Sequence, residues 1–408
     1  MQFLKLGATA IATGVLTALT MAPALAQQPI PLTKQIIAPL NEARAAIIAK
    51  DWPTAKAKLA ASTAQAKTPT DKLAIEKLTI VMATQTKDSA EQIRSLQAML
   101  SSGLLTPDEK KQYKGAIAGV YAEAGDAQKS NAAFREFIDE YGGTAEQYAA
   151  VGNEYLKQKD FPTAITYGNK AIDAVKATGG KAPEPYYHLL MRAHKESNDM
   201  DKYYAVEEQL VGVYPKELYW KELIAARTQD APGYGGLIRL DMFRAMQAAN
   251  IPLSAQEKRT ASAEALKRGL PAEAIQILEP AIASGELSEA DDKENLKDAK
   301  AMLATDKTGL VKEAADAMAK GTGLSLANIG EAMLSHGDNA KAIELIQKGI
   351  ERGISDAGEL DIAKLHLGIA QSRSGQKDAA RATWATIKSD NGSAVLAKNW
   401  TLISTLLP

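Results

Sequence analysis

The 408-residue chain contains no cysteine, and this absence excludes several kinds of chemistry at the outset. Without a thiol there is no disulfide, no thiolate metal site and no lipid attachment to an N-terminal cysteine. Histidine is scarce as well. The two nearest of the four, His188 and His194, lie six residues apart, so they do not form the i, i+4 pair of a helical metal site. We therefore expect no metal, no cofactor and no catalytic residues.

An excess of charge of either sign is also lacking. The chain has 48 basic and 49 acidic side chains, and 47 basic ones remain if an N-terminal leader containing Lys5 is removed. A net charge near −2 gives no reason to expect nucleic acid or an anionic membrane surface as a partner. These classes of partner are therefore not predicted.

The chain begins with a short positive segment, an apolar run to about Met21, and the small residues Ala24 and Ala26. This order is typical of a secretory signal peptide, so we expect residues 1–26 to be cleaved and Gln27 to begin a periplasmic or secreted protein. An uncleaved anchor helix is the alternative, but glycine and threonine interrupt the run, and it falls short of the ~20 apolar residues that span a bilayer. No later segment is apolar enough, so no membrane span is expected after cleavage.

Alternating strand patterns are almost absent from the rest of the chain, whereas apolar residues recur at spacings of three and four. This spacing predicts amphipathic helices, and turn residues interrupt it at intervals of about 32–39 residues. One longer gap, between Asp199 and Gly269, leaves room for a further turn near 231–233. The other predicted turns are Asp51–Trp52, Asp88, Gly125–Asp126, Asp160–Phe161, Asp199–Met200, Gly269–Leu270, Asp306, Gly337–Asp338 and Gly375–Gln376.

Helix ends carry their own signals at regular distances. Thr106–Glu109 and Ser254–Glu257 have the spacing of a capping box, in which each side chain bonds the backbone N–H of the other residue. Gly285 and Gly353, which are expected to end helices in the left-handed conformation, lie 68 residues apart. That distance is twice 34 residues and indicates an internal repeat.

The clearest repeat places Tyr148, Gly152 and Tyr155 on one helical face, followed by a turn at 159–161 and a second helix with the small residue Ala164. Small residues let two helices approach closely, and aromatic side chains fill the wider gaps. The pattern resembles the tetratricopeptide (TPR) repeat, a helix-turn-helix unit of about 34 residues. The resemblance implies an all-α fold, a right-handed TPR-like α-solenoid of about ten antiparallel helix pairs. The positions assigned to repeat packing are Tyr121, Tyr148, Gly152, Tyr155, Ala164, Gly330, Ala342, Gly368 and Ala380.

Composition divides the predicted solenoid. A cluster of turn-forming residues at 229–236 suggests a hinge between an N-terminal solenoid, 27–228, and a C-terminal solenoid, 237–408, that ends in a capping helix. All thirteen tyrosines lie between Tyr113 and Tyr234. Several are expected at repeat-packing positions, but four are harder to place in a core and suggest an aromatic-lined recognition surface. These four are Tyr186, Tyr203, Tyr204 and Tyr219.

Three short motifs imitate the serine β-lactamase and penicillin-binding protein set. Residues 374–377 fit S-x-x-K, residues 389–391 fit S-D-N and residues 307–309 fit K-T-G. Their order along the chain differs from that family, and K-T-G is expected in a turn between helices instead of on a strand. We interpret the three as chance matches and predict that the protein is not an enzyme.

The TPR resemblance also implies where a partner binds, because TPR arrays present the first helix of each pair along a concave groove. The matching inward positions are Asn153, Lys157, His188, Arg192 and Lys195. Asn153 and Lys157 match part of the carboxylate clamp of chaperone-binding TPR domains. Glycines replace two other clamp residues, at Gly115 and Gly119, and are expected to leave the groove open.

Two functions remain open from the sequence. The first is an exported TPR-repeat adaptor that binds another protein, as a peptide or a partner helix, in its concave groove. The second is a structural or assembly component of a cell-envelope or secretion complex that acts through other surfaces. The sequence leaves the oligomeric state and the identity of the partner undetermined.

Overall fold

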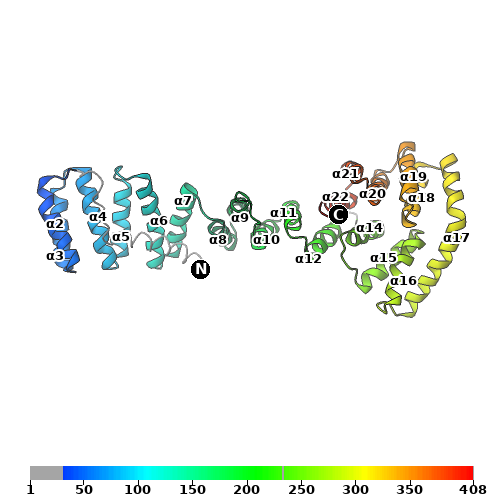
Figure 1. The fold of residues 1–408 in the computed structure, drawn as a ribbon, viewed down its shortest axis with the longest axis horizontal. Coiled ribbons are helices and arrows are strands. Elements are labelled where there is room, and N and C mark those ends of the chain that lie inside the picture. The colour runs from blue at the N-terminus through cyan, green and yellow to red at the C-terminus, as the bar shows by residue number, and fades with distance from the viewer. Residues whose placement is uncertain (1–30, 232–233, 408) are drawn as a thin grey trace. The chain divides into compact units, whose positions relative to one another are not determined.

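The computed structural model describes residues 31–231 and 234–407, and in this part of the chain 21 α-helices and one π-helical turn are the regular elements (Figure 1). No β-strand occurs among the described residues, so the predicted all-α helical-repeat fold is confirmed. The predicted leader, 1–26, lies outside the described residues. The chain divides into two compact units, one ending at Asn198 and the other beginning at Asp199.

The first unit is a row of antiparallel helix pairs, and one core cluster of side chains joins α6 and α7 to α8 and α9. The pairs α2/α3, α4/α5, α6/α7 and α8/α9 are followed by α10, which packs on α9 and α8. The helices are α2 (Lys34–Ile48), α3 (Trp52–Gln65), α4 (Pro69–Gln85), α5 (Ser89–Leu100), α6 (Pro107–Glu123), α7 (Ala127–Tyr141), α8 (Ala145–Lys157), α9 (Phe161–Lys176) and α10 (Glu184–Glu196).

Six of the predicted turns share one construction. A residue with positive φ ends the first helix, and the next residue, an aspartate, caps the second helix by accepting a hydrogen bond from the backbone N–H three residues on. The positive-φ residue is glycine at Gly125 but lysine at Lys50, Lys87 and Lys159. The capping aspartates are Asp51, Asp88, Asp126, Asp160, Asp199 and Asp338.

Both predicted capping boxes are present. The backbone N–H of Thr106 donates to Glu109 Oε2 at 2.9 Å, and that of Ser254 donates to Glu257 Oε2 at 2.7 Å. In each box the hydroxyl accepts the return bond from the glutamate's own N–H. The pairs satisfy backbone donors that a helix start would otherwise leave unpaired.

The second unit contains the remaining helices, and Figure 1 labels most of them. Its clearest pairs are α15/α16, α18/α19 and α20/α21. The elements are α11 (Met200–Val213), α12 (Glu217–Lys221), η1 (Glu222–Ala226), α13 (Arg227–Gln229), α14 (Gly236–Ala248), α15 (Ala255–Lys267), α16 (Pro271–Ala283), α17 (Ala290–Lys320), α18 (Gly323–Ser335), α19 (Asn339–Arg352), α20 (Ala357–Arg373), α21 (Lys377–Trp384) and α22 (Ser393–Leu406).

The predicted turn at Asp306 is wrong, because α17 runs through it as one helix of 31 residues. The other turns place a glycine, lysine or asparagine with positive φ before the cap. Asp306 follows the β-branched Thr305, which disfavours that conformation, and no proline interrupts the helix. The predicted break at 229–236 falls between α13 and α14, inside the second unit.

The last helix, α22, returns to the beginning of its unit. It packs on α20 and α21, as a terminal helix would, and also on α14, α13 and η1. A buried hydrogen bond of 3.4 Å from Asn399 Nδ2 to Thr228 Oγ1 joins residues that are 171 positions apart. The second unit is therefore closed by contacts between its two ends, whereas helices of the first unit contact only near neighbours.

Candidate functional site

The predicted repeat-packing positions lie where helices of a pair approach each other. A Cβ atom on Gly152 would lie 3.2 Å from the carbonyl oxygen of Ala164. The side chains of Tyr148 and Tyr155 are partly buried against the core cluster of α6 to α9, and Tyr121 is half-buried. The other assigned residues, Gly330, Ala342, Gly368 and Ala380, are buried.

The predicted groove residues all lie on α8 and α10, two helices that contact each other within the first unit. Asn153 and Lys157 are exposed on α8, and His188, Arg192 and Lys195 are exposed on α10. We call these five residues the α8–α10 face. Its side chains are polar, and together they present both hydrogen-bond donors and positive charge.

Three members of the α8–α10 face have neighbours on their own helices. Asn153 Nδ2 donates to the carbonyl oxygen of Ala149 at 2.9 Å. Lys157 lies 3.5 Å from Glu154, and Arg192 Nε lies 2.6 Å from Glu196. Because exposed ion pairs contribute only about 0–1 kcal/mol, a partner could exchange them for its own contacts at little cost.

Two expectations for this region are wrong. Gly115 and Gly119, expected to line an open groove, are buried along α6. The tyrosines at 203, 204 and 219 were expected on a recognition surface, but they are 7 %, 7 % and 8 % exposed. Tyr203 donates to Glu222 and Tyr204 to Asp230, both at 2.7 Å, and these bonds allow the two hydroxyls to be buried.

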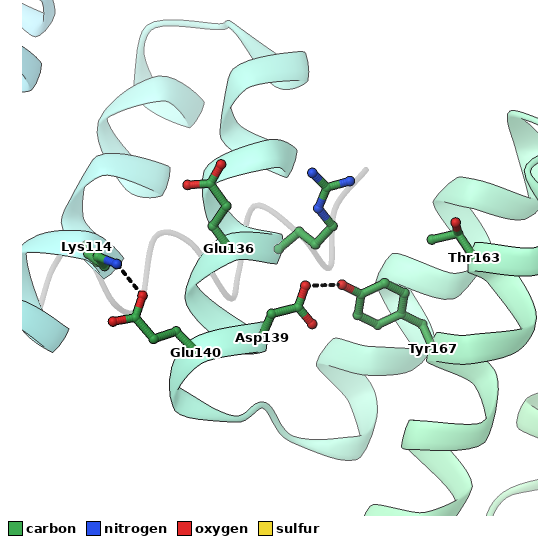
Figure 2. A pocket seen from close by; sticks show the side chains of 7 residues that line it. Lys114, Glu136, Asp139, Glu140, Thr163 and Tyr167 are labelled. Atoms are coloured by element: carbon green, nitrogen blue, oxygen red, sulfur yellow. Dashed lines mark hydrogen bonds and ion pairs between the residues drawn. The ribbon is translucent and has the colours of Figure 1, made fainter.

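A hollow of about 670 Å³ lies against α6, α7 and α9 in the first unit (Figure 2). Its charged side chains face one another: Lys114 pairs with Glu140, and Tyr167 donates to Asp139 at 2.7 Å. Burial, and then the bond to Asp139, raise the pKa of Tyr167 above its usual range. Four of the lining side chains therefore already pair with one another, which weakens the hollow as a recognition site.

The β-lactamase-like motifs do not form a reaction site. Residues 307–309 lie inside α17 and not in the predicted turn. Lys377 Nζ donates to the carbonyl oxygen of Leu407 at 3.2 Å, and Ser389 Oγ donates to Asp361 Oδ2 at 2.7 Å. Both groups thus hold parts of the fold together.

A buried group of charges that the sequence did not reveal lies in the second unit, with Arg244 of α14 at its centre. Arg244 is 2 % exposed, and its guanidinium donates to Asp241 at 2.6 Å, to Glu331 at 2.9 Å and to Glu273 at 2.7 Å. The three carboxylates come from α14, α18 and α16. Every nitrogen of the guanidinium is therefore engaged, and Arg244 is a fixed positive charge.

His366 and Arg268 complete this group, which we call the Arg244 cluster. His366 Nε2 lies 3.1 Å from both carboxylate oxygens of Asp241, and Arg268 lies 2.5 Å from Glu331. Burial alone would raise the pKa of Asp241, but the neighbouring His366, Arg244 and Arg268 hold it well below its usual range. Burial opposes ionisation of Glu331 in the same way, and the same neighbours lower its pKa.

The Arg244 cluster has the spacing of a metal site but not its chemistry. Asp241, Glu331 and His366 each place one ligand atom within 4.8 Å of the others. However, Arg244 and Arg268 donate to the same carboxylates, so guanidinium groups occupy the place of a cation. We therefore interpret the cluster as a buried ionic network that joins α14, α16, α18 and α20.

A cavity of about 380 Å³ lies beside the Arg244 cluster, between α14, α20, α21 and α22, and we call it the cationic cavity. Three cations and no carboxylate line it. Its residues are Arg244, Gln247, Ala248, Ser372, Arg373, Lys377, Trp400, Ile403, Ser404 and Leu407.

No protein-family model and no curated protein matches the sequence. Among solved structures, a tetratricopeptide repeat protein from Parabacteroides merdae aligns at 12 % identity, over 82 % of this chain and 100 % of that one, with a TM-score of 0.26. The APC/C hetero-tetramer Cut9–Hcn1 aligns at 11 % identity, over 79 % and 66 %, with a TM-score of 0.21. Alignments at these scores carry no argument about function or shape. The chain is similar to TPR proteins because its own packed helix pairs and recurring turns have that construction.

Proposed function

We propose that the protein is an exported TPR-like adaptor that binds another protein through the α8–α10 face. The observation that carries the proposal is the exposure of five polar side chains on two contacting helices, α8 and α10. An extended peptide or a helix laid across α8 and α10 would meet donors from both. The pairs of Lys157 and Arg192 with glutamates are weak enough to be exchanged for contacts with a partner.

Export is the second part of the proposal and rests on the signal-peptide pattern of residues 1–26. Among the described helices, none has both the length and the hydropathy needed to cross a membrane. Mass spectrometry of the protein recovered from a periplasmic fraction tests export directly. A chain that begins at Gln27 supports it, and an intact Met1 in the cytoplasmic fraction contradicts it.

Binding is tested by capturing partners from an envelope extract with the tagged chain from Gln27 onward, after brief crosslinking. The informative variant replaces Asn153, Lys157 and Arg192 by alanine together. Its matched control removes one amide and two cations elsewhere in the first unit, at Gln97, Lys56 and Lys72, which are all exposed. A partner lost with the first variant and retained with the control supports the α8–α10 face.

The same capture separates the adaptor from the structural alternative. A large complex that is recovered equally with both triple variants would contradict binding at the α8–α10 face and favour a component that acts through other surfaces. Circular dichroism of both variants is the control for folding, because the three replaced side chains are exposed and their loss should leave the helical signal unchanged.

A further inference from the structure

We propose that the cationic cavity binds a small organic monocarboxylate that carries an apolar group. This inference is independent of the proposed protein partner, because the cavity lies wholly within the second unit. Its volume of about 380 Å³ falls in the range of sites for small molecules, about 300–1,000 Å³. The charge, the free donors and the apolar wall of the cavity each narrow the class of ligand.

Arg373 supplies the free donors. It ends α20, lines the cavity, and its guanidinium has no hydrogen bond or ion pair among the described residues. Desolvation by the surrounding protein, and then the charge of Arg244, lower the pKa of Arg373. Because Arg373 is exposed and has no ion pair, its guanidinium is open to an anion in the cavity. The planar fork of an arginine pairs in a bidentate manner with carboxylate.

The surrounding charges favour a monoanion. Arg244 and Arg268 are already paired with the carboxylates of the Arg244 cluster, whereas Arg373 and Lys377 line the cavity and have no ion pair among the described residues. One carboxylate would be attracted by both of these cations. A multiply charged phosphate would add repulsion from the buried carboxylates that pair with Arg244.

Part of the cavity lining is apolar. Trp400, Ile403 and Leu407 present indole and aliphatic surface to the space. A carboxylate with an apolar tail matches both the cationic and the apolar parts of the lining.

Titration of the full-length chain with hexanoate and with phenylacetate tests the proposal. Isothermal titration calorimetry gives the affinity, and tryptophan fluorescence, to which Trp400 contributes with three other tryptophans, gives a second signal. We expect saturable binding below about 10 mM, and no binding of hexanamide or phenylacetamide, which have the same tails without the charge. Arg373→Gln should weaken binding at least about ten-fold, because it removes the charge and the fork.

The matched control is Arg381→Gln, which removes an arginine of the neighbouring helix α21 that pairs with Asp378 and does not line the cavity. It should bind both carboxylates as the unmodified chain does. Since Arg373 is exposed, its replacement should not unfold the protein, and a melting curve checks this. The titration is repeated with a Gly-Ser extension after Pro408, because the extension separates the carboxylate at the end of the chain from the lining residue Leu407. Binding to either form supports the proposal.

Four results would overturn the proposal. These are the absence of saturable binding in both forms, equal binding of the neutral amides, unchanged affinity in Arg373→Gln, and tighter binding of inorganic phosphate than of either carboxylate. The last result would show an anion site of a different class. A change in tryptophan fluorescence that neither saturates nor is accompanied by heat of binding is treated as an absence of saturable binding.

Discussion

Replacing Glu207 by glutamine should abolish most of the loss of stability that the protein undergoes as the pH rises from about 5 to 8. Glu207 lies on α11, is fully buried, and neither of its carboxylate oxygens has a hydrogen-bond partner among the described residues. Desolvation, and then the charge of Glu222, raise the pKa of Glu207 to about 8, although Arg227 acts in the opposite direction. The carboxyl is therefore protonated in the folded protein at neutral pH.

The sign and size of the effect follow from the two pKa values. The unfolded chain releases this proton near its ordinary pKa of 4.5, whereas the folded chain retains it to about 8. The folded state then binds more protons than the unfolded state throughout this window, so its stability falls as the pH rises and levels off above about 8. At 1.36 kcal/mol for each pH unit, the loss between pH 5 and pH 7 is roughly 3 kcal/mol.

Urea unfolding at pH 5, 6, 7 and 8, followed by circular dichroism, measures this loss. Glu207→Gln keeps the size of the side chain and cannot ionise, so the variant should match the unmodified protein at pH 5 and exceed its stability at pH 7. Glu208→Gln is the control on the same helix, because Glu208 is accessible and pairs with Arg227. Parallel stability curves for Glu207→Gln and the unmodified protein would refute the reasoning, since they would mean that Glu207 ionises normally in the fold.

Three further substitutions, the first with a control variant, test the packing and the Arg244 cluster. Gly368→Ala places a Cβ atom 2.1 Å from the indole Nε1 of the buried Trp384, so it should destabilise the protein by roughly 1–3 kcal/mol or more in thermal melts. The control, Gly212→Ala, has open space around the new Cβ atom and should be neutral or stabilising in the same melts. Gly152→Leu should also cost roughly 1–3 kcal/mol, and an unchanged melting curve would contradict the close contact of α8 with α9. Arg244→Met leaves three buried carboxylates without their guanidinium and should cost about 3–5 kcal/mol in urea unfolding, so a loss below about 1 kcal/mol would show that the cluster is hydrated.

The turns could be predicted from the sequence because each is encoded locally. A residue that tolerates positive φ, followed by an aspartate that caps the next helix, needs only two adjacent positions. Lysine takes the first position at Lys50, Lys87 and Lys159, so glycine alone would have missed these turns. The failure at Asp306 has the same origin: the aspartate is present, but the preceding Thr305 cannot readily adopt the left-handed conformation.

The Arg244 cluster could not be predicted in this way. Arg244 and Glu273 are 29 residues apart, Arg244 and Glu331 are 87 apart, and Asp241 and His366 are 125 apart. No sequence repeat or motif relates positions so far apart, and each residue taken alone has the pattern of a charged residue on the exposed face of a helix. The prediction for Tyr203 and Tyr204 was wrong for a related reason. Their hydroxyls can be buried because they bond to Glu222 and Asp230, which lie 19 and 26 residues away along the chain.

The two units differ in how their stability is distributed. In the first unit each helix contacts only near neighbours, so its stability approaches a sum of local interfaces, as in an open helical repeat. In the second unit α22 packs on both α14 and α20, and the Arg244 cluster joins α14, α16, α18 and α20. Loss of α22 would remove one wall of the cationic cavity and admit water to Arg244, whose buried partners depend on exclusion of solvent. Closure by α22 therefore makes the ionic network and the cavity depend on each other, and the second unit should open as a whole and not repeat by repeat.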